Sequence, residues 1–207
     1  MAVGYDNASW FYEKLSKLVF GQAQIRAQEY FLSQISSDAH ILIIGGGTGQ
    51  ILESLTKVHP SGLSIAYVEI SPKMMALSRK RNTGKNIVEY YTEDISQISF
   101  NQKFEVIITA FVFDNFTDEN VAKLLPQVSR WCKPHCIWLD TDFQLTGARW
   151  QKLMLYSMYT FFRTIGAVNV NQLPDVQNVF DVCNYQLTDE KEFYGRFIYS
   201  RVYKRSF

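Results

Sequence analysis

At 207 residues and 47% hydrophobic content, the chain is long enough to form one globular domain with a complete core. Its net charge of +1 gives no electrostatic footprint for nucleic acid, and no apolar run reaches the roughly 18 residues of a membrane span. The three cysteines form no C-x-x-C pair and the N-terminus lacks the apolar core of a signal peptide, so we expect a cytoplasmic protein with reduced thiols. The three histidines show no metal-ligand spacing, and no metal site is expected.

The chain begins with helical patterns and then alternates between strands and helices. Residues 8–35 carry apolar side chains at helical spacing and predict two helices separated at Gly21. Short apolar runs then alternate with helical segments, which predicts an α/β fold with a doubly wound, mostly parallel sheet. The five expected strands of this part span residues 41–44, 64–69, 87–91, 104–110 and 136–140.

The first strand runs directly into a glycine-rich loop. Residues 41–44 are aliphatic, and Gly45, Gly47 and Gly49 follow at alternate positions before a helical pattern begins. Glycines at the carboxyl end of a buried strand allow a tight turn and let a ligand approach bare backbone. The G-x-G-x-x-G spacing of dinucleotide folds is absent because Gln50 occupies the third glycine position, and no P-loop pattern is present. The loop therefore predicts a nucleotide-type site of another kind.

The second strand ends in an acidic residue. Glu69 lies about 20 residues beyond Gly49, the spacing at which an acid can accept hydrogen bonds from both ribose hydroxyls. NAD-dependent enzymes share this feature, so Glu69 indicates a ribose without choosing between cofactors. The alternative is a solvated glutamate at a strand end.

A G-x-G-x-G loop after a hydrophobic strand, followed by such an acid, resembles the class I S-adenosylmethionine (SAM) methyltransferases. The run Ile70-Ser71-Pro72 also resembles this family, in which a helix opens at a proline after the acid. The resemblance covers essentially the whole chain, while its specific motifs lie within residues 41–143. One position departs from the pattern, because the family often has an acid two residues before the first glycine and this chain has Ile43. Contacts to the methionine amino group must then come from backbone carbonyls near Gly45 or from elsewhere.

The resemblance implies further cofactor-binding residues in the core. Ile70 follows the ribose-binding acid and belongs to the same site. Asp94 matches an aspartate that accepts from the adenine amino group, and Ile95 matches the apolar residue that packs on the ring; an exposed loop aspartate is the alternative. Ala110 ends the fourth strand and faces the same rim as the glycine loop, because ligands bind outside the carboxyl ends of parallel strands.

The N-terminal segment is loosely similar to that of the quinone-biosynthesis methyltransferases. In those enzymes a tyrosine of such a segment folds over the cofactor, and Tyr5 and Tyr12 are the candidates here. Aromatic packing of a terminal helix is the alternative.

The C-terminal part adds elements beyond a nucleotide-binding core. Residues 149–165 predict a helix whose apolar face is too broad for one contact with the sheet. Some of its apolar residues are expected to meet the N-terminal aromatic segment, a second subunit or an apolar acceptor, and core packing is the alternative; they are Trp150, Met154, Tyr159 and Phe162. A second helix, 174–183, precedes two strands, 185–193 and 196–203, joined at Tyr194-Gly195. This antiparallel hairpin would complete the seven-stranded sheet of the methyltransferase family.

The resemblance predicts a single SAM-dependent methyltransferase domain over residues 1–207, with an N-terminal helical segment (1–36), a cofactor-binding core (37–143) and acceptor-side helices with the terminal hairpin (144–207). SAM is the expected cofactor, and the expected partner is a small, hydrophobic or aromatic acceptor rather than nucleic acid. A homodimer is an open possibility.

The catalytic residue stays unassigned in the sequence. Asp114, Asp142 and Tyr159 are candidates for a general base by location. A non-catalytic SAM-binding or scaffold protein is the first alternative, and a nicotinamide-dependent oxidoreductase, disfavoured by Gln50 and the terminal hairpin, is the second.

Overall fold

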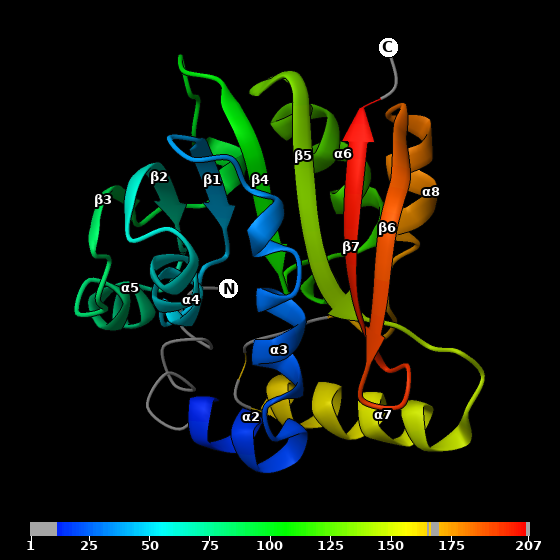
Figure 1. The fold of residues 1–207 in the computed structure, drawn as a ribbon. Helices are drawn as coiled ribbons and strands as arrows, with labels where there is room; N and C mark the ends of the chain where they lie inside the picture. The colour runs from blue at the N-terminus through cyan, green and yellow to red at the C-terminus, as the bar shows by residue number, and fades with distance from the viewer. Residues whose placement is uncertain (1–11, 165, 167–169, 206–207) are drawn as a thin grey trace.

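The computed structural model describes residues 12–164, 166 and 170–205, and shows a seven-stranded sheet flanked by helices (Figure 1). The strand order is β3-β2-β1-β4-β5-β7-β6. The strands are β1 (His40–Ile44), β2 (Ser61–Val68), β3 (Lys85–Tyr91), β4 (Phe104–Ala110), β5 (Cys132–Phe143), β6 (Tyr185–Phe193) and β7 (Ile198–Arg205). Strands β1 to β5 pair in parallel, and β7 pairs antiparallel with both β5 and β6. The predicted doubly wound sheet with a closing antiparallel hairpin is confirmed.

Helices cover both faces of the sheet and its carboxyl edge. They are α2 (Tyr12–Phe20), α3 (Ala23–Glu29), α4 (Gln50–Val58), α5 (Pro72–Ser78), α6 (Asp118–Ser129), α7 (Arg149–Thr164) and α8 (Val176–Val182), with 3-10 turns η1 (Leu32–Gln34), η2 (Ile95–Gln97) and η3 (Phe113–Asn115). In Figure 1, α2 and α7 lie across the lower end of the molecule, the end toward which β1, β4 and β5 point. Both helices therefore lie beyond the carboxyl ends of these strands.

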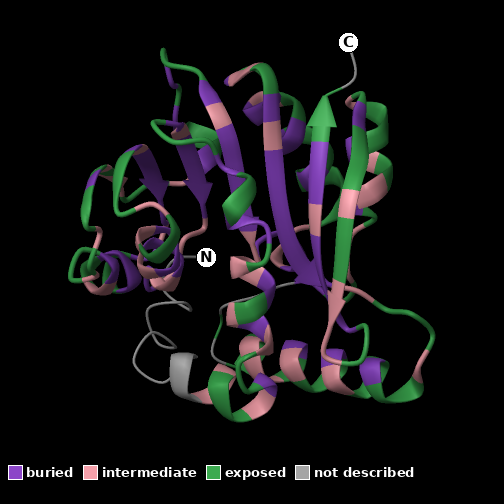
Figure 2. Cartoon of the chain, viewed as in Figure 1, coloured by how far each residue is buried: buried purple, intermediate pink, exposed green. Residues whose placement is uncertain are grey.

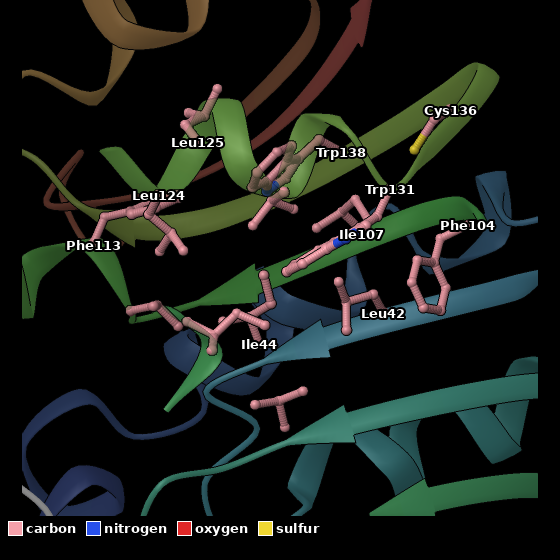
Figure 3. Close-up of a cluster of buried hydrophobic side chains, with 14 of the residues drawn as sticks. Leu42, Ile44, Phe104, Ile107, Phe113, Leu124, Leu125, Trp131, Cys136 and Trp138 are labelled. Carbon is pink, nitrogen blue, oxygen red and sulfur yellow. The ribbon is translucent and has the colours of Figure 1, made fainter. Parts of the chain in front are cut away.

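Alternating side chains of the central strands supply two separate cores. Leu42 and Ile44 belong to the cluster on the α6 and α8 side, which Figure 3 shows with Trp138 and Leu125. Ile41 and Ile43 point to the other face and join the cluster that includes residues of α4 and α5. Figure 2 shows β1 and most of β4 and β5 in the colour of buried residues. Burial on both faces explains why these strands are nearly continuous aliphatic runs.

A third cluster lies at the carboxyl edge and contains most of the aromatic face of α7. Tyr159 is buried in it, Met154 and Phe162 are half-buried against it, and Trp150 packs edge-on against Tyr194 and Phe197. Core packing therefore accounts for Met154, Tyr159 and Phe162, whereas Trp150 keeps 42% of its surface exposed. Leu153 and Tyr156 of α7 are more exposed still.

Several predicted boundaries were wrong, including both ends of β5. The strand begins four residues earlier than predicted, at Cys132, and runs on to Phe143. The Lys133-Pro134-His135 segment therefore lies inside the strand, where His135 has φ 66° and the register with β4 shifts. Pro126 lies inside α6, which continues past it to Ser129.

Candidate cofactor site

The glycine loop folds back onto the end of β2. The N–H groups of Gly45 and Gly46 both donate to the carbonyl of Val68, at 2.9 and 3.2 Å. The N–H of Gly47 donates to Glu69 Oε2 at 2.8 Å, and that of Gly49 donates to the carbonyl of Gly46 at 3.2 Å. The loop thus satisfies these backbone donors within the protein, and its shape is tied to the acid that the sequence singled out.

The glycines of the loop serve different purposes. A Cβ on Gly46 would lie 2.2 Å from the ring of the buried Tyr67, and a Cβ on Gly49 would lie 2.8 Å from Cα of Ser78 in α5. Gly47 has φ +62°, and a Cβ there would have no neighbour within 4 Å. Gly46 and Gly49 therefore permit close packing, whereas Gly47 presents bare backbone to open space.

Glu69 is buried, with 5% of its surface exposed, and it organises two backbone segments. Its Oε2 accepts from Gly47 N–H and its Oε1 accepts from Ser71 N–H, both at 2.8 Å. Ser71 in turn caps α5 by accepting from the N–H of Met74. Because a carboxylate oxygen can accept more than one hydrogen bond, these contacts leave Glu69 able to accept from a ligand as well.

A cavity of about 390 Å³ opens at this point of the carboxyl edge, within the usual range for small-molecule sites. Its wall includes nearly all of the core residues that the sequence assigned to the cofactor: Gly45, Gly47, Glu69, Ile70, Asp94, Ile95 and Ala110. Gly49 is missing from the wall, because it packs α4 against α5 instead. Tyr5 lies outside the described residues, and the same holds for the side chain of Tyr12.

Other parts of the cavity wall were not predicted. Helices α2 and α3 contribute Lys17, Gln24 and Gln28, and the segment after β4 contributes Phe111 and Phe116. No sequence spacing marks these residues, because their approach to the loop depends on how distant elements pack. Phe111 has φ 56°, an unusual value for a bulky residue and one that often marks a functional position.

The three candidate bases do come together, but in another place. Asp114 N–H donates to Asp142 Oδ2 at 3.1 Å, and Tyr159 Oη donates to the carbonyl of Asp114 at 3.0 Å. All three line a second cavity of about 540 Å³, bounded by α7, the segment before α8, and β7. None of them lines the cavity at the glycine loop, so the structure gives no support for their predicted role as a base beside the cofactor.

The carboxyl groups of the second cavity have shifted acidities. Burial raises the pKa of Asp114 to about 7, and the charge of Asp140 adds to the shift. Burial also raises the pKa of Asp142 well above its usual range, and the charges of Asp114 and Asp140 act in the same direction. Asp140 itself accepts from Thr109 and Tyr199 at 2.7 and 2.8 Å. This cluster is a buried polar network beneath the second cavity.

The described residues bear on two further features, a metal site and a membrane-spanning helix. They contain no group of three or more His, Cys, Asp or Glu side chains arranged to hold a metal ion. No helix among them is both long and apolar enough to cross a bilayer.

Comparisons with known proteins agree with this geometry. A family model described as a methyltransferase domain matches residues 41–135. The malonyl-[acyl-carrier protein] O-methyltransferase of Bacillus cereus is 28% identical over 112 residues, which cover 54% of this chain and 39% of that protein. The ubiquinone/menaquinone biosynthesis C-methyltransferase UbiE of Wigglesworthia glossinidia brevipalpis is 27% identical over 165 residues, 76% of this chain and 64% of that one. Neither match reaches two thirds of the relative's own length.

Solved structures share the fold at low sequence identity. The 1,6-didemethyltoxoflavin-N1-methyltransferase of Burkholderia thailandensis has a TM-score of 0.70 at 11% identity, over 100% of this chain and 88% of that one. The N-methyltransferase NodS of Bradyrhizobium japonicum has a TM-score of 0.62 at 14% identity, over 87% and 94%. The chain has the doubly wound fold of the class I methyltransferases, and residues 41–135 match a methyltransferase domain.

Proposed function

We propose that the chain transfers a methyl group from SAM to a small hydrophobic or aromatic acceptor. The observation that carries this proposal is the cavity at the glycine loop, where Glu69 and the bare backbone of Gly47 meet. Bound SAM would supply a methyl group made electrophilic by its sulfonium. The residues of the chain then have to bind and orient the reactants, and positioning of this kind can contribute up to about 7–11 kcal/mol.

The donors and acceptors of the cavity fit SAM at several points. Asp94 accepts from Ser96 N–H through Oδ1, and its Oδ2 has no hydrogen-bond partner among the described residues, so it can accept from an adenine amino group. The carbonyl of Gly45 likewise accepts no hydrogen bond from the described residues and can receive the methionine ammonium. A pyrophosphate is a poorer fit, because the N–H groups of Gly45, Gly46, Gly47 and Gly49 already donate within the protein.

An apolar acceptor is supported by the wall next to the end of β4. Phe111 and Phe116 line this part of the cavity, and Ile25 of α3 also belongs to the cavity wall. Together they offer aromatic and aliphatic surface for a ring or an acyl chain. The longer of the two matches described above is also to an enzyme named for quinone biosynthesis. The carboxylates among the described wall residues, Glu69, Glu93 and Asp94, follow β2 and β3. Because these carboxylates lie on the side expected to bind ribose and adenine, they are not placed to deprotonate the acceptor. This favours an acceptor whose nucleophilic group needs no base from the protein.

The proposal has a two-stage test. Titration with S-adenosylhomocysteine should raise the melting temperature of the protein, and titration with NADH should not. Incubation with SAM labelled on its methyl group and a panel of small phenols and quinols should then give labelled product in an organic extract. Label found only in protein or tRNA would contradict the hydrophobic acceptor. Binding of S-adenosylhomocysteine with no transfer to any acceptor would favour a non-catalytic SAM-binding protein.

A further inference from the structure

The glycine loop offers few hydrogen-bond donors to the charged amino-acid tail of SAM. Its carboxylate needs hydrogen-bond donors, yet the N–H groups of Gly45, Gly46, Gly47 and Gly49 are all engaged within the protein. On the proposed function, the carboxylate must therefore be bound by another part of the cavity wall.

Charge is distributed unevenly around the cavity. Its carboxylates, Glu69, Glu93 and Asp94, follow strands β2 and β3, on the side expected to bind ribose and adenine. Lys17 is the only basic side chain among the described wall residues, and it comes from α2. An anionic group in this cavity is therefore attracted toward α2 and away from the β2 and β3 ends.

Gln24 of α3 is the second donor of this region. It is only 8% exposed and lines the cavity. Ser16 Oγ donates to its Oε1, which leaves its Nε2 as a donor with no hydrogen-bond partner among the described residues. Because Ser16 directly precedes Lys17, this hydrogen bond also holds the lysine-bearing turn of α2 beside Gln24.

The first turn of α4 also lines the cavity, and α4 is joined to α3. Ser54 Oγ of α4 donates to Glu29 of α3 at 2.7 Å, which joins the two helices. Gln50 and Ile51 begin α4 and line the cavity. As in any helix, their N–H groups have no acceptor within the helix, and the partial positive charge of this end favours an anion.

We propose that Lys17 and Gln24 bind the α-carboxylate of SAM, beside the first turn of α4. The tail would then be oriented by helices that precede the nucleotide-binding core, with the carbonyl of Gly45 receiving the ammonium group.

A pair of ligands separates the tail from the rest of the cofactor. S-adenosylhomocysteine contains the amino-acid tail, whereas 5′-methylthioadenosine has the same adenosine and sulfur without it. Calorimetry should show that Lys17→Gln weakens S-adenosylhomocysteine binding about five- to tenfold, because a charge-assisted hydrogen bond at an exposed position is partly screened. Gln24→Glu should weaken it about tenfold or more, because a second carboxylate repels the first. Both variants should bind 5′-methylthioadenosine like the original chain.

Lys123→Gln is the matched control, because Lys123 is an exposed lysine of α6 that does not line the cavity. It should leave the affinity for both ligands unchanged. Unaltered S-adenosylhomocysteine affinity in both site variants would overturn the inference, as would an equal loss for the two ligands. If the original chain binds neither ligand, the proposed function itself fails and the inference fails with it. If it binds 5′-methylthioadenosine and S-adenosylhomocysteine equally well, SAM recognition stands and only the carboxylate site is refuted.

Discussion

The two cavities at the carboxyl edge of the sheet differ in the chemical groups that form them. The one at the glycine loop is shaped by backbone, and its central acid, Glu69, is held by two N–H groups. The second one lies over buried carboxyl groups, Asp114 and Asp142, whose pKa values are raised by burial. The first is organised to receive hydrogen bonds from a ligand. In the second, burial makes the charged forms of these carboxyl groups unfavourable and so lowers the stability of the fold when they ionise. The two cavities should therefore respond differently to pH and to mutation.

The largest expected effect is on the pH dependence of stability. The pKa of Asp114 is about 7 in the folded protein, above the value near 4 of an exposed aspartate. The folded state therefore binds this proton more tightly than the unfolded state, and stability should fall as pH rises from about 4 to about 7. Because one pKa unit corresponds to about 1.4 kcal/mol, the change can amount to a few kcal/mol, shared between the coupled groups.

Urea unfolding at pH 5 and pH 8 measures this effect. Asp114→Asn imitates the protonated side chain, so its free energy of unfolding should change less between the two values than that of the original chain. Asp181→Asn alters an exposed aspartate of α8 and serves as the control. An unchanged pH dependence in Asp114→Asn would show that the buried carboxyl groups contribute little.

The next largest effect concerns Glu69. Glu69→Ala removes charge-assisted hydrogen bonds to the ribose worth about 1.5–3 kcal/mol, or roughly 10- to 150-fold in SAM affinity. The structure adds an expectation that the sequence did not contain, because Gly47 and Ser71 would each lose the partner of an N–H group. The free energy of unfolding should therefore fall by about 1–3 kcal/mol as well.

Calorimetry with S-adenosylhomocysteine and urea unfolding would measure both changes in one variant. Glu93→Ala is a suitable control, since Glu93 lines the same cavity but is exposed and, in the described part of the chain, makes no hydrogen bond to the glycine loop. A folded Glu69→Ala protein with normal affinity would remove Glu69 from the site.

The sequence was most informative where backbone geometry dictates residue type. Buried central strands need aliphatic runs, and a loop that turns sharply against β2 needs glycine, so β1, β4 and the loop could be predicted closely. The beginning of β5 could not, because Lys133-Pro134-His135 resembles a turn but lies between Cys132 and Ile137, which both pair with β4. The ends of an element depend more on its neighbours than on its own composition.

Side chains that act by approach in space were harder to predict. Asp114 and Asp142 were predicted because they follow strands whose carboxyl ends lie at the ligand-binding edge of the sheet. That edge carries two separate cavities, and both residues line the second one. Asp142 faces Tyr199 of β7 across the sheet pairing and belongs to the second cavity. Lys17 and Gln24 were missed for the converse reason, because no spacing along the chain connects α2 and α3 with the loop.

Gly46 and Gly47 are neighbours in the loop of the first cavity, and alanine substitutions at the two positions should have different effects. Gly47→Ala places a methyl group in open space at φ +62°, which costs about 1–2 kcal/mol in stability and puts the methyl where the ligand must approach. Gly46→Ala would overlap the ring of Tyr67 and should destabilise the fold by about 1–3 kcal/mol. At matched residual stability, S-adenosylhomocysteine binding should be lost in Gly47→Ala and retained in Gly46→Ala. The reverse pattern would mean that the loop is an ordinary turn.

The smallest expected effect tests whether the aromatic face of α7 binds the acceptor. If the acceptor bound against this face, Met154→Ala would raise the acceptor KM, but Met154 lines neither cavity and packs half-buried against the third cluster. We now expect a loss of roughly 1–2 kcal/mol in stability, below the 2–5 kcal/mol of a fully buried methionine, with no change in KM. Leu153→Ala, its exposed neighbour on α7, should change stability by no more than about 0.5 kcal/mol. A raised KM in Met154→Ala at normal stability would restore the pocket that the sequence suggested, and would place the acceptor against α7 rather than beside Phe111.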